Sequence, residues 1–355
     1  MKLHPILKSA AVLALAALAA CNKAESTAAP LKTPAANAAP EKAAPPPIVV
    51  DEKAMQDATK RVDDAASEAA AKLKSAVDAV TKDVVKKPLR FSGIPNQNTT
   101  ELEAKYKPLA GYLTTKLGVP VEYVPSADYN ASVDAFKNGD LLLCWFGGYT
   151  GVQARAAVSG ARAIACGPRD MKFRSYFVAN KNAGLKHGLD FPMALKGKKF
   201  TFGSASSTSG RLMPEYFIRR ETKLSPKDFF GAEPSFTKGH DQTLELVAAG
   251  TFDAGVVDYT VYDKRVKEKK VDPELVQVIW ESPEFFDYQF TAHPALDTTY
   301  GPGFTDRLQA VLVSMKGADL ELLSAMDRQE GGLIACKNED FETLRKLAVE
   351  IGLLR

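Results

Sequence analysis

Serine and threonine residues dominate one short stretch of the sequence, GSASSTSGR at 203–211, which also contains two glycines. An alternating, partly apolar run precedes it and a helical pattern follows it, so we expect this stretch at the start of a helix. The amides at a helix N-terminus have no intrahelical partner and carry a partial positive charge, so they can bind an anion without a lysine. One hydroxyl is enough to cap a helix. The further hydroxyls exceed what a cap needs. They predict an anion site made by Ser206, Ser207, Thr208, Ser209 and Gly210.

Two further strand ends carry groups suited to an anion. In GHD (239–241) we expect Asp241 to cap a helix, which would direct His240 from the end of a strand towards the ligand. Asp258 ends the strand-like run at 252–259. A carboxylate repels a fully deprotonated dianion, but it accepts a hydrogen bond from the O–H of a monoprotonated oxyanion. A purely structural histidine is the alternative for His240, since its position alone favours neither role.

Two strand-end turns in the preceding part of the chain complete the candidate site. They are IPNQN (94–98) and WFGGYTG (145–151). We expect Tyr149 at a helix N-terminus, where it can donate a hydrogen bond, and Phe146 and Gln97 as walls of the pocket. Plain packing is the alternative for Phe146 and Tyr149.

The sequence carries no HExxH, GxSxG, P-loop or closely spaced Cys–His motif. His240 and Asp258 could act as an acid–base pair, but no nucleophile or set of metal ligands accompanies them. We therefore expect a binding protein rather than an enzyme, with no cofactor and no metal.

The elements that would position these residues alternate between strands and helices from Pro88 onwards. This order predicts an α/β fold with parallel sheets and helices on their faces. The length suggests two lobes, and the chain is expected to leave the first lobe, form the second and return. Ligands of such sheets bind at the carboxyl ends of the strands, hence in the cleft between the lobes. The expected boundaries are 88–177 with 284–355 for the first lobe and 178–283 for the second.

The residues before the globular region predict export and attachment to a membrane. Residues 1–20 have a charged start and a short apolar core, as in a secretory signal peptide. They end in LAAC, which resembles the lipobox of bacterial lipoproteins and would make Cys21 the lipidated residue. An ordinary signal followed by an unrelated cysteine is the alternative. Residues 21–50 are rich in Ala and Pro and predict a disordered tether, and residues 51–87 predict a helical stalk with a heptad-like series of small apolar residues.

Charge and cysteine content bear on nucleic-acid binding and on disulfide formation. The formal net charge is +3 with interspersed signs, which does not resemble a basic nucleic-acid surface. Besides Cys21 the chain has Cys144, Cys166 and Cys336, so at least one thiol of the exported protein is free or intermolecular. Buried thiols are favoured, and one disulfide could form between partners that the sequence does not identify. A monomer is expected, because the small stalk residues bury little area, with weak self-association of the stalk as the alternative.

Four segments resemble a known protein family: RFSGIPNQNTTEL, LLLCWFGGYTGVQAR, FGSASSTSGRLMP and GHDQTLELVAAGTFDAG. They resemble the phosphate-, phosphite- and phosphonate-type substrate-binding proteins of ABC importers, and two of them look most like the branch labelled selenate-binding. The resemblance covers about 88–350. It implies a type 2 periplasmic-binding fold and a tetrahedral oxyanion held by Ser206 to Ser209. His240 and Asp258 would be its partners, and the turn at Phe146–Tyr149 would close over it.

The identity of the anion depends on Asp258 and, as a minor option, on Cys144. In the selenate-labelled branch an amide is expected near position 258, so a carboxylate there favours phosphonate, phosphite or phosphate. Related binders of arsenic oxyanions use cysteine, and Cys144 lies on the same strand face as Phe146. The resemblance thus predicts a periplasmic, lipid-anchored solute-binding protein whose partners are an ABC permease and its ATPase. The alternatives are binding of a selenate- or sulfate-like oxyanion, and a sensory protein that signals to a membrane kinase, which the long stalk mildly favours.

Overall fold

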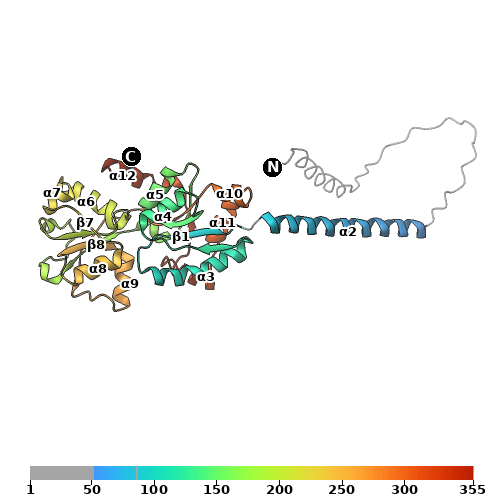
Figure 1. Ribbon diagram of the computed structural model, residues 1–355. Helices are drawn as coiled ribbons and strands as arrows, with labels where there is room; N and C mark the ends of the chain where they lie inside the picture. Colours follow the sequence, from blue (N-terminus) through green and yellow to red (C-terminus); the bar gives the residue numbers. More distant parts are fainter. Residues whose placement is uncertain (1–51, 85–86, 355) are drawn as a thin grey trace, which may run out of the picture. The chain divides into compact units, whose positions relative to one another are not determined.

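A computed structural model describes residues 52–84 and 87–354 (Figure 1). The predicted signal peptide, Cys21 and the tether lie outside these residues. The first described element is α2 (Glu52–Val84), a helix of 33 residues. Val62 and Leu73, two members of the heptad-like series, are 67% and 64% exposed, so their side chains contact solvent. Within the described ranges, none of the helices has both the length and the apolar character that crossing a bilayer requires.

The first lobe is built on a six-stranded sheet with the order β11-β4-β10-β3-β1-β2. Its strands are β1 (Leu89–Gly93), β2 (Val121–Tyr123), β3 (Leu143–Phe146), β4 (Arg162–Cys166), β10 (Gln289–Ala292) and β11 (Ile334–Ala335). Its helices are α3 (Thr99–Leu117), α4 (Tyr129–Lys137), α5 (Gly148–Ala157), α10 (Ala295–Tyr300), α11 (Phe304–Val313) and α12 (Glu342–Glu350), with the short turns η1 (Pro168–Lys172), η5 (Gly317–Leu323) and η6 (Asn338–Phe341). Figure 1 shows α11 beside α3, although most of the globular region separates them in sequence.

Local signals in the sequence account for the helix boundaries of this lobe. The Asn98 side chain accepts a hydrogen bond from the Glu101 amide (3.1 Å) and so begins α3. Gly118 ends α3 in the left-handed conformation (φ 70°), which glycine adopts without strain. Both ends of α3 thus follow from residues within the local sequence.

The first sheet is mixed, which corrects the expectation of a parallel sheet. β1 pairs parallel with β2 and β3, but β10 lies between β3 and β4 and is antiparallel to both. The reason is that β10 follows the second lobe, so the returning chain runs through the sheet in the opposite direction. Apolar residues of the central strands, among them Phe91, Leu143 and Ile164, are fully buried.

The second lobe is built on a five-stranded sheet with the order β7-β6-β8-β5-β9. Its strands are β5 (Ser175–Asn180), β6 (Phe200–Phe202), β7 (Ser235–Phe236), β8 (Ala254–Asp258) and β9 (Val276–Glu281). Its helices are α6 (Met213–Thr222), α7 (Pro226–Phe230), α8 (His240–Ala248) and α9 (Tyr259–Lys267), with the turns η2 (Lys181–Ala183), η3 (Met193–Leu195) and η4 (Thr208–Leu212). Figure 1 shows α6 to α9, in yellow and orange, gathered around this sheet. β6 is parallel to β8, whereas β5 is antiparallel to both β8 and β9.

Two antiparallel segments carry the chain between the lobes. Phe173 and Phe285 exchange both backbone hydrogen bonds, at 2.8 and 3.0 Å. β5 already begins at Ser175, so the lobe boundary expected at 177 falls inside a second-lobe strand and must move towards the N-terminus. The α/β fold with two lobes and a double crossing is as predicted.

Candidate functional site

The serine-rich stretch forms the π-helical turn η4 between β6 and α6, where the sequence predicts an ordinary helix start. Ser207 caps this turn. Its Oγ accepts a hydrogen bond from the Gly210 amide (2.9 Å), and its carbonyl accepts one from the Leu212 amide (3.0 Å). Thr208 and Ser209 lie before the residues whose amides donate within this turn, so their own amides have no acceptor within the helix. π-helical turns are frequent at functional sites.

The other hydroxyls of this stretch have different surroundings. Thr208 Oγ1 accepts a hydrogen bond from the Tyr149 amide (2.9 Å), and Ser206 Oγ donates one to Asn130 Oδ1 (2.5 Å). Both bonds join the second lobe to the first. Ser209 Oγ is buried and has no hydrogen-bond partner. Among these hydroxyls, Ser209 therefore offers the group most suited to a ligand.

Gly210 serves the packing of two backbone segments. A Cβ at this position would lie 3.1 Å from the Gly203 Cα and 3.0 Å from Ser207 Oγ. The Gly203 amide also donates a hydrogen bond to the Gly210 carbonyl (2.9 Å). The sequence places Gly210 in the predicted anion site, but its close neighbour in the structure is another part of the chain.

Helix α8 begins differently from the prediction. Gly239 occupies its capping position, so the prediction that Asp241 caps this helix is wrong. The two Asp241 oxygens accept hydrogen bonds from Arg265 Nε and Nη2, at 2.7 and 2.6 Å, and one of them also accepts from the Asn98 amide. The guanidinium competes with the helix amides, because hydrogen bonds between charged groups are stronger than those to neutral amides.

His240 is fully buried at the first position of α8. Its Nδ1 accepts a hydrogen bond from the Asp258 amide (3.3 Å), so the proton of the neutral ring lies on Nε2. Burial lowers the pKa of His240, although the charges of Asp258 and Asp241 act in the opposite direction. Nε2 has no protein partner. The neutral ring therefore presents one unused N–H donor.

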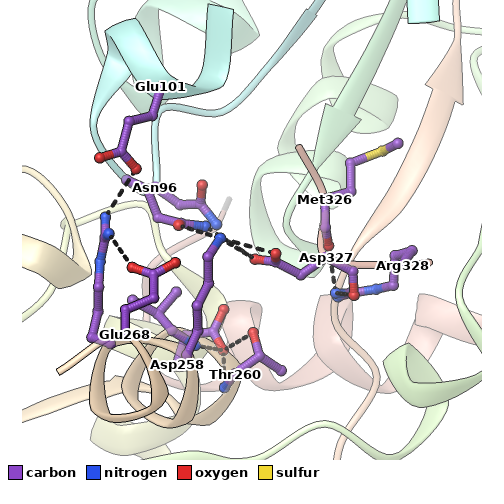
Figure 2. Close-up of polar contacts among 12 residues, drawn as sticks. Asn96, Glu101, Asp258, Thr260, Glu268, Met326, Asp327 and Arg328 are labelled. Carbon is purple, nitrogen blue, oxygen red and sulfur yellow. Dashed lines mark hydrogen bonds and ion pairs between the residues drawn. The ribbon is translucent and has the colours of Figure 1, made fainter. Parts of the chain in front are cut away.

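Asp258 ends β8 and caps α9 (Figure 2). Its Oδ1 accepts hydrogen bonds from the Thr260 amide and hydroxyl, both at 2.7 Å. Its Oδ2 accepts one from the Tyr288 hydroxyl (3.1 Å), which itself accepts from Asn96 Nδ2 (3.0 Å). The carboxylate thus has a structural role as a cap, and Oδ2 retains capacity for another donor.

Tyr129 is a candidate site residue that the sequence analysis missed. It is the first residue of α4, and its hydroxyl is buried without a hydrogen-bond partner. Burial raises the pKa of Tyr129 well above its usual value, and the charges of Asp258 and Asp287 raise it further, whereas the nearby Ser207 hydroxyl acts to lower it. The available signal was the strand-end turn PSAD (125–128), a third turn at the same end of the first sheet.

Asp287 is the second residue that the sequence analysis missed. It lies on the segment that returns to the first lobe and is 1% exposed. Its Oδ1 accepts a hydrogen bond from the Gly148 amide (2.8 Å), and its Oδ2 has no partner. Burial raises the pKa of Asp287 to about 8, although the hydrogen bonds from Gly148 and Thr208 act to lower it. No motif marks this residue in the sequence.

The residues that carry these unused groups form a polar cluster, which we define as Tyr129, Ser209, His240, Asp258 and Asp287. His240 contacts Asp258 directly, and the charge of Asp258 perturbs the pKa values of both Tyr129 and Asp287. Ser209 is joined to Asp258 through Ser175, whose Oγ donates to the Ser209 carbonyl (2.7 Å) and which pairs with Asp258 in the sheet. An unpaired buried polar group costs about 1–3 kcal/mol. Four such groups together indicate a polar ligand.

Three predicted site residues have other partners. Phe146 is fully buried in β3 and packs edge-on against Phe136 (5.6 Å), as in the packing alternative. The Tyr149 hydroxyl donates to the Leu353 carbonyl (2.5 Å), so only its amide faces the serine-rich turn. Gln97 Oε1 accepts a hydrogen bond from Lys264 Nζ (3.2 Å). None of these three residues contributes a hydrogen bond to the polar cluster.

Lys264 forms a further contact between the lobes. Its Nζ lies 2.9 Å from Asp327 Oδ1, and the two side chains are mostly buried. Figure 2 shows Asp327 next to Arg328 on a first-lobe segment. The Arg328 guanidinium binds both oxygens of buried Asp170, and its Nη1 donates to the Met326 carbonyl (2.6 Å). This network holds Asp327 in place opposite the second lobe.

A cavity of about 850 Å³ lies elsewhere on the boundary between the lobes. Its lining includes Asn98 and Glu101 from the first lobe and Lys238, Asp241 and Arg265 from the second, but no member of the polar cluster. Arg265 is already paired with Asp241 and lies 3.5 Å from Glu101. The buried polar cluster is therefore the better candidate for a small anion.

Comparisons with known proteins agree with this architecture. Residues 91–341 match the family described as ABC transporter, phosphonate, periplasmic substrate-binding protein. The chain is 38% identical over 231 residues to the probable ABC transporter phosphite binding protein PhnD1 of Prochlorococcus marinus, which covers 64% of this chain and 77% of the relative. It is 31% identical over 235 residues to the phosphate-import protein PhnD of Mycolicibacterium smegmatis, which covers 63% and 70%.

Solved structures show the same fold. PhnD1 from Prochlorococcus marinus in complex with methylphosphonate has a TM-score of 0.71 and 32% identity, and covers 76% of this chain and 99% of that chain. A binding protein component of an ABC phosphonate transporter from Pseudomonas aeruginosa has a TM-score of 0.64 at 17% identity, covering 75% and 87%. These matches confirm the two-lobe periplasmic-binding fold.

Proposed function

The chain belongs to the family of periplasmic substrate-binding proteins of phosphonate ABC transporters, and from that premise we propose that it binds one small phosphorus oxyanion between its lobes. The family consists of binding proteins, so the prediction of a binding protein rather than an enzyme is confirmed. The observation that carries the ligand proposal is the polar cluster with its unused, buried donors and acceptors.

The cluster supplies neutral donors to the phosphorus-bound oxygens. They are the Tyr129 hydroxyl, the Ser209 hydroxyl and the His240 Nε2–H, together with the amides at the start of η4 that have no acceptor within the helix. None of these residues, nor Asp258 or Asp287, forms an ion pair or hydrogen bond with a Lys or Arg within residues 87–354. Donors fixed in a buried site stabilise an anion more strongly than the same donors in water.

The two carboxyl groups favour an anion that still carries a proton. Asp258 Oδ2 can accept a hydrogen bond from the O–H of a monoprotonated anion. Asp287, with its pKa raised to about 8, is largely protonated at neutral pH, so it adds little repulsion and can itself donate. Sulfate and selenate carry no proton at neutral pH, so they have no O–H that could donate a hydrogen bond to Asp258. This difference in protonation supports phosphonate, phosphite or phosphate, the ligands that appear in the names of the relatives.

Cys144 does not favour an arsenic oxyanion. It is fully buried in β3, and burial raises the pKa of its thiol well above the usual value. A thiolate is the form that acts as a ligand. Selenate and sulfate remain the alternatives that binding data must separate.

In the proposed role, the two lobes close around the anion and the loaded form meets a membrane permease driven by its ATPase. The bonds from Thr208 and Ser206 to the first lobe support such closure. Attachment through a lipid on Cys21 rests on the lipobox-like sequence. A sensory protein that reports to a membrane kinase is the second candidate, which the length of α2 favours.

Isothermal titration of the chain from Asn22 onwards tests the proposal. The panel contains phosphate, phosphite, methylphosphonate, 2-aminoethylphosphonate, sulfate, selenate, arsenite and arsenate, each at two pH values. We expect tight binding of at least one phosphorus anion and none of sulfate. Binding of selenate or sulfate alone would overturn the ligand proposal, and a lack of heat with every anion would direct attention to a larger ligand.

A further inference from the structure

Two of the three buried cysteines lie side by side at one edge of the first sheet. Cys166 ends β4, and Cys336 directly follows β11, the two-residue strand that pairs antiparallel with β4. The register places Ile334 opposite Cys166, and the Cys336 amide donates to the Ile164 carbonyl (3.3 Å). Because side chains alternate along a strand, both thiols project from the same face of the sheet, at diagonal positions.

Both thiols are free in this structure, and the Cys166 side chain perturbs the thiol of Cys336. Cys166 is 2% exposed and Cys336 is 8% exposed. The interaction with the Cys166 side chain is the largest cause that raises the pKa of Cys336, ahead of burial, whereas the charge of Arg155 acts to lower it. The Arg155 guanidinium lies over the Phe341 ring, 5.0 Å from its centre. A neighbouring cation favours the thiolate, which is the species that attacks a disulfide.

We propose that Cys166 and Cys336 form an intramolecular disulfide in the exported protein and that Cys144 stays a free thiol. The proposal rests on the periplasmic location of the family, where disulfides form and persist, and it does not depend on the ligand. Cys144 lies on β3, and β10 separates that strand from β4. The sheet order therefore leaves Cys144 away from the paired edge, which accounts for the odd number of thiols.

The reaction is an exchange with an external disulfide, either of a thiol–disulfide oxidoreductase or of a small molecule such as oxidised glutathione. One S–S bond forms between Cys166 and Cys336 while the S–S bond of the oxidant breaks. Two electrons pass to the oxidant, which leaves as two thiols with the two protons of the cysteines. Because both sulfurs are buried in the folded chain, the exchange takes place before β11 has docked on β4.

The bond would also fix the segment that carries the contact between the lobes. Asp327 and Arg328 lie between α11 and β11, so Cys336 marks the point where this segment is joined to the sheet. A crosslink that closes a long loop stabilises a protein mainly by restricting its unfolded chain.

Peptide mapping of the full chain, exported and purified without reductant, tests the proposal. Trypsin places Cys144 in 138–155, Cys166 in 163–169 and Cys336 in 329–337. After denaturation in iodoacetamide, we expect the second and third peptides linked to each other and the first alkylated. Reduction of the denatured chain should release the linked pair, and the chain refolded with reductant present should melt roughly 5 °C or more lower.

Two variants separate the pair from the third thiol. Cys336→Ser should abolish both the linked peptides and the effect of reductant on melting, whereas Cys144→Ser, the matched control, should retain both. Alkylation of all three cysteines in the unreduced wild-type protein would overturn the proposal, and so would a link through Cys144. The mapping of the wild-type protein does not require either variant to fold.

Discussion

The hydroxyl of Tyr129 allows the sharpest test of the polar cluster. Tyr129→Phe removes one oxygen and leaves the ring in place. That oxygen is buried and no hydrogen bond of normal geometry joins it to the protein, although the Ser207 hydroxyl lies close enough to lower its pKa, so its removal should cost the folded chain little. A hydrogen bond to a charged group contributes about 1.5–3 kcal/mol. We therefore expect the Kd for the phosphorus anion to rise about 10- to 150-fold.

Affinity and stability should respond differently to this substitution. Isothermal titration measures the Kd, and thermal unfolding without ligand measures the stability, which should be unchanged or slightly higher. Tyr262→Phe is a matched control, because the Tyr262 hydroxyl donates to the Val276 carbonyl (2.6 Å) in the core of the second lobe. This control should lose about 1 kcal/mol of unfolding free energy and keep its affinity.

Two results would refute the reasoning about Tyr129. A change in Kd below about threefold, less than 1 kcal/mol, would show that its hydroxyl does not contact the anion. A loss of stability as large as that of Tyr262→Phe would show that the hydroxyl has a structural partner instead.

Three further substitutions follow from the same geometry. Asp258→Asn keeps a residue that can cap α9, but it should weaken binding of monoprotonated anions about tenfold and reduce discrimination against sulfate. Competition titrations check this, and unchanged selectivity would contradict it. Asp287→Asn should remove a pH dependence of stability. Because its pKa is raised to about 8, the folded chain holds an extra proton between about pH 4 and 8, so wild-type stability falls by up to about 1.4 kcal/mol per unit as the pH rises through that window. Denaturant unfolding near pH 6 and pH 7.5 measures the slope, and parallel curves for the two proteins would exclude the effect. Lys264→Met breaks the 2.9 Å contact with Asp327 between the lobes and should raise the Kd about fivefold, or about 1 kcal/mol, mainly through faster dissociation. Stopped-flow kinetics measure this, and a double-mutant cycle with Asp327→Asn that gives additive effects would show that the pair is not coupled.

Much of the fold could be predicted because it follows from local patterns. Alternating strand and helix patterns and glycine at the end of α3 all act within a few residues. The position of β10 could not be predicted in this way, because it depends on a strand that returns from the other lobe and inserts between β3 and β4. Its insertion turns the expected parallel sheet into a mixed one.

The second-lobe part of the polar cluster could also be predicted, because Ser209, His240 and Asp258 each lie in a segment that follows or ends a strand. Their roles in binding remain predictions. The capping prediction for Asp241 failed because Arg265, 24 residues away in sequence, takes its carboxylate. Tyr129 has the sequence appearance of a core aromatic at the start of an amphipathic helix, and Asp287 lies in an extended run without a motif. Only their burial without a partner distinguishes them.

The serine-rich stretch shows why residue type alone could not assign the site. Its hydroxyls resemble one another in sequence, but the structure gives them separate roles: Ser207 caps η4, and Thr208 and Ser206 bind the first lobe. Ser209 alone among these four keeps a buried, unpaired hydroxyl. The turn that would hold the anion is therefore also the turn through which the lobes contact each other. A ligand at Ser209 would stabilise η4 in the position that Thr208 needs to reach Tyr149, so that binding and closure of the lobes would reinforce one another.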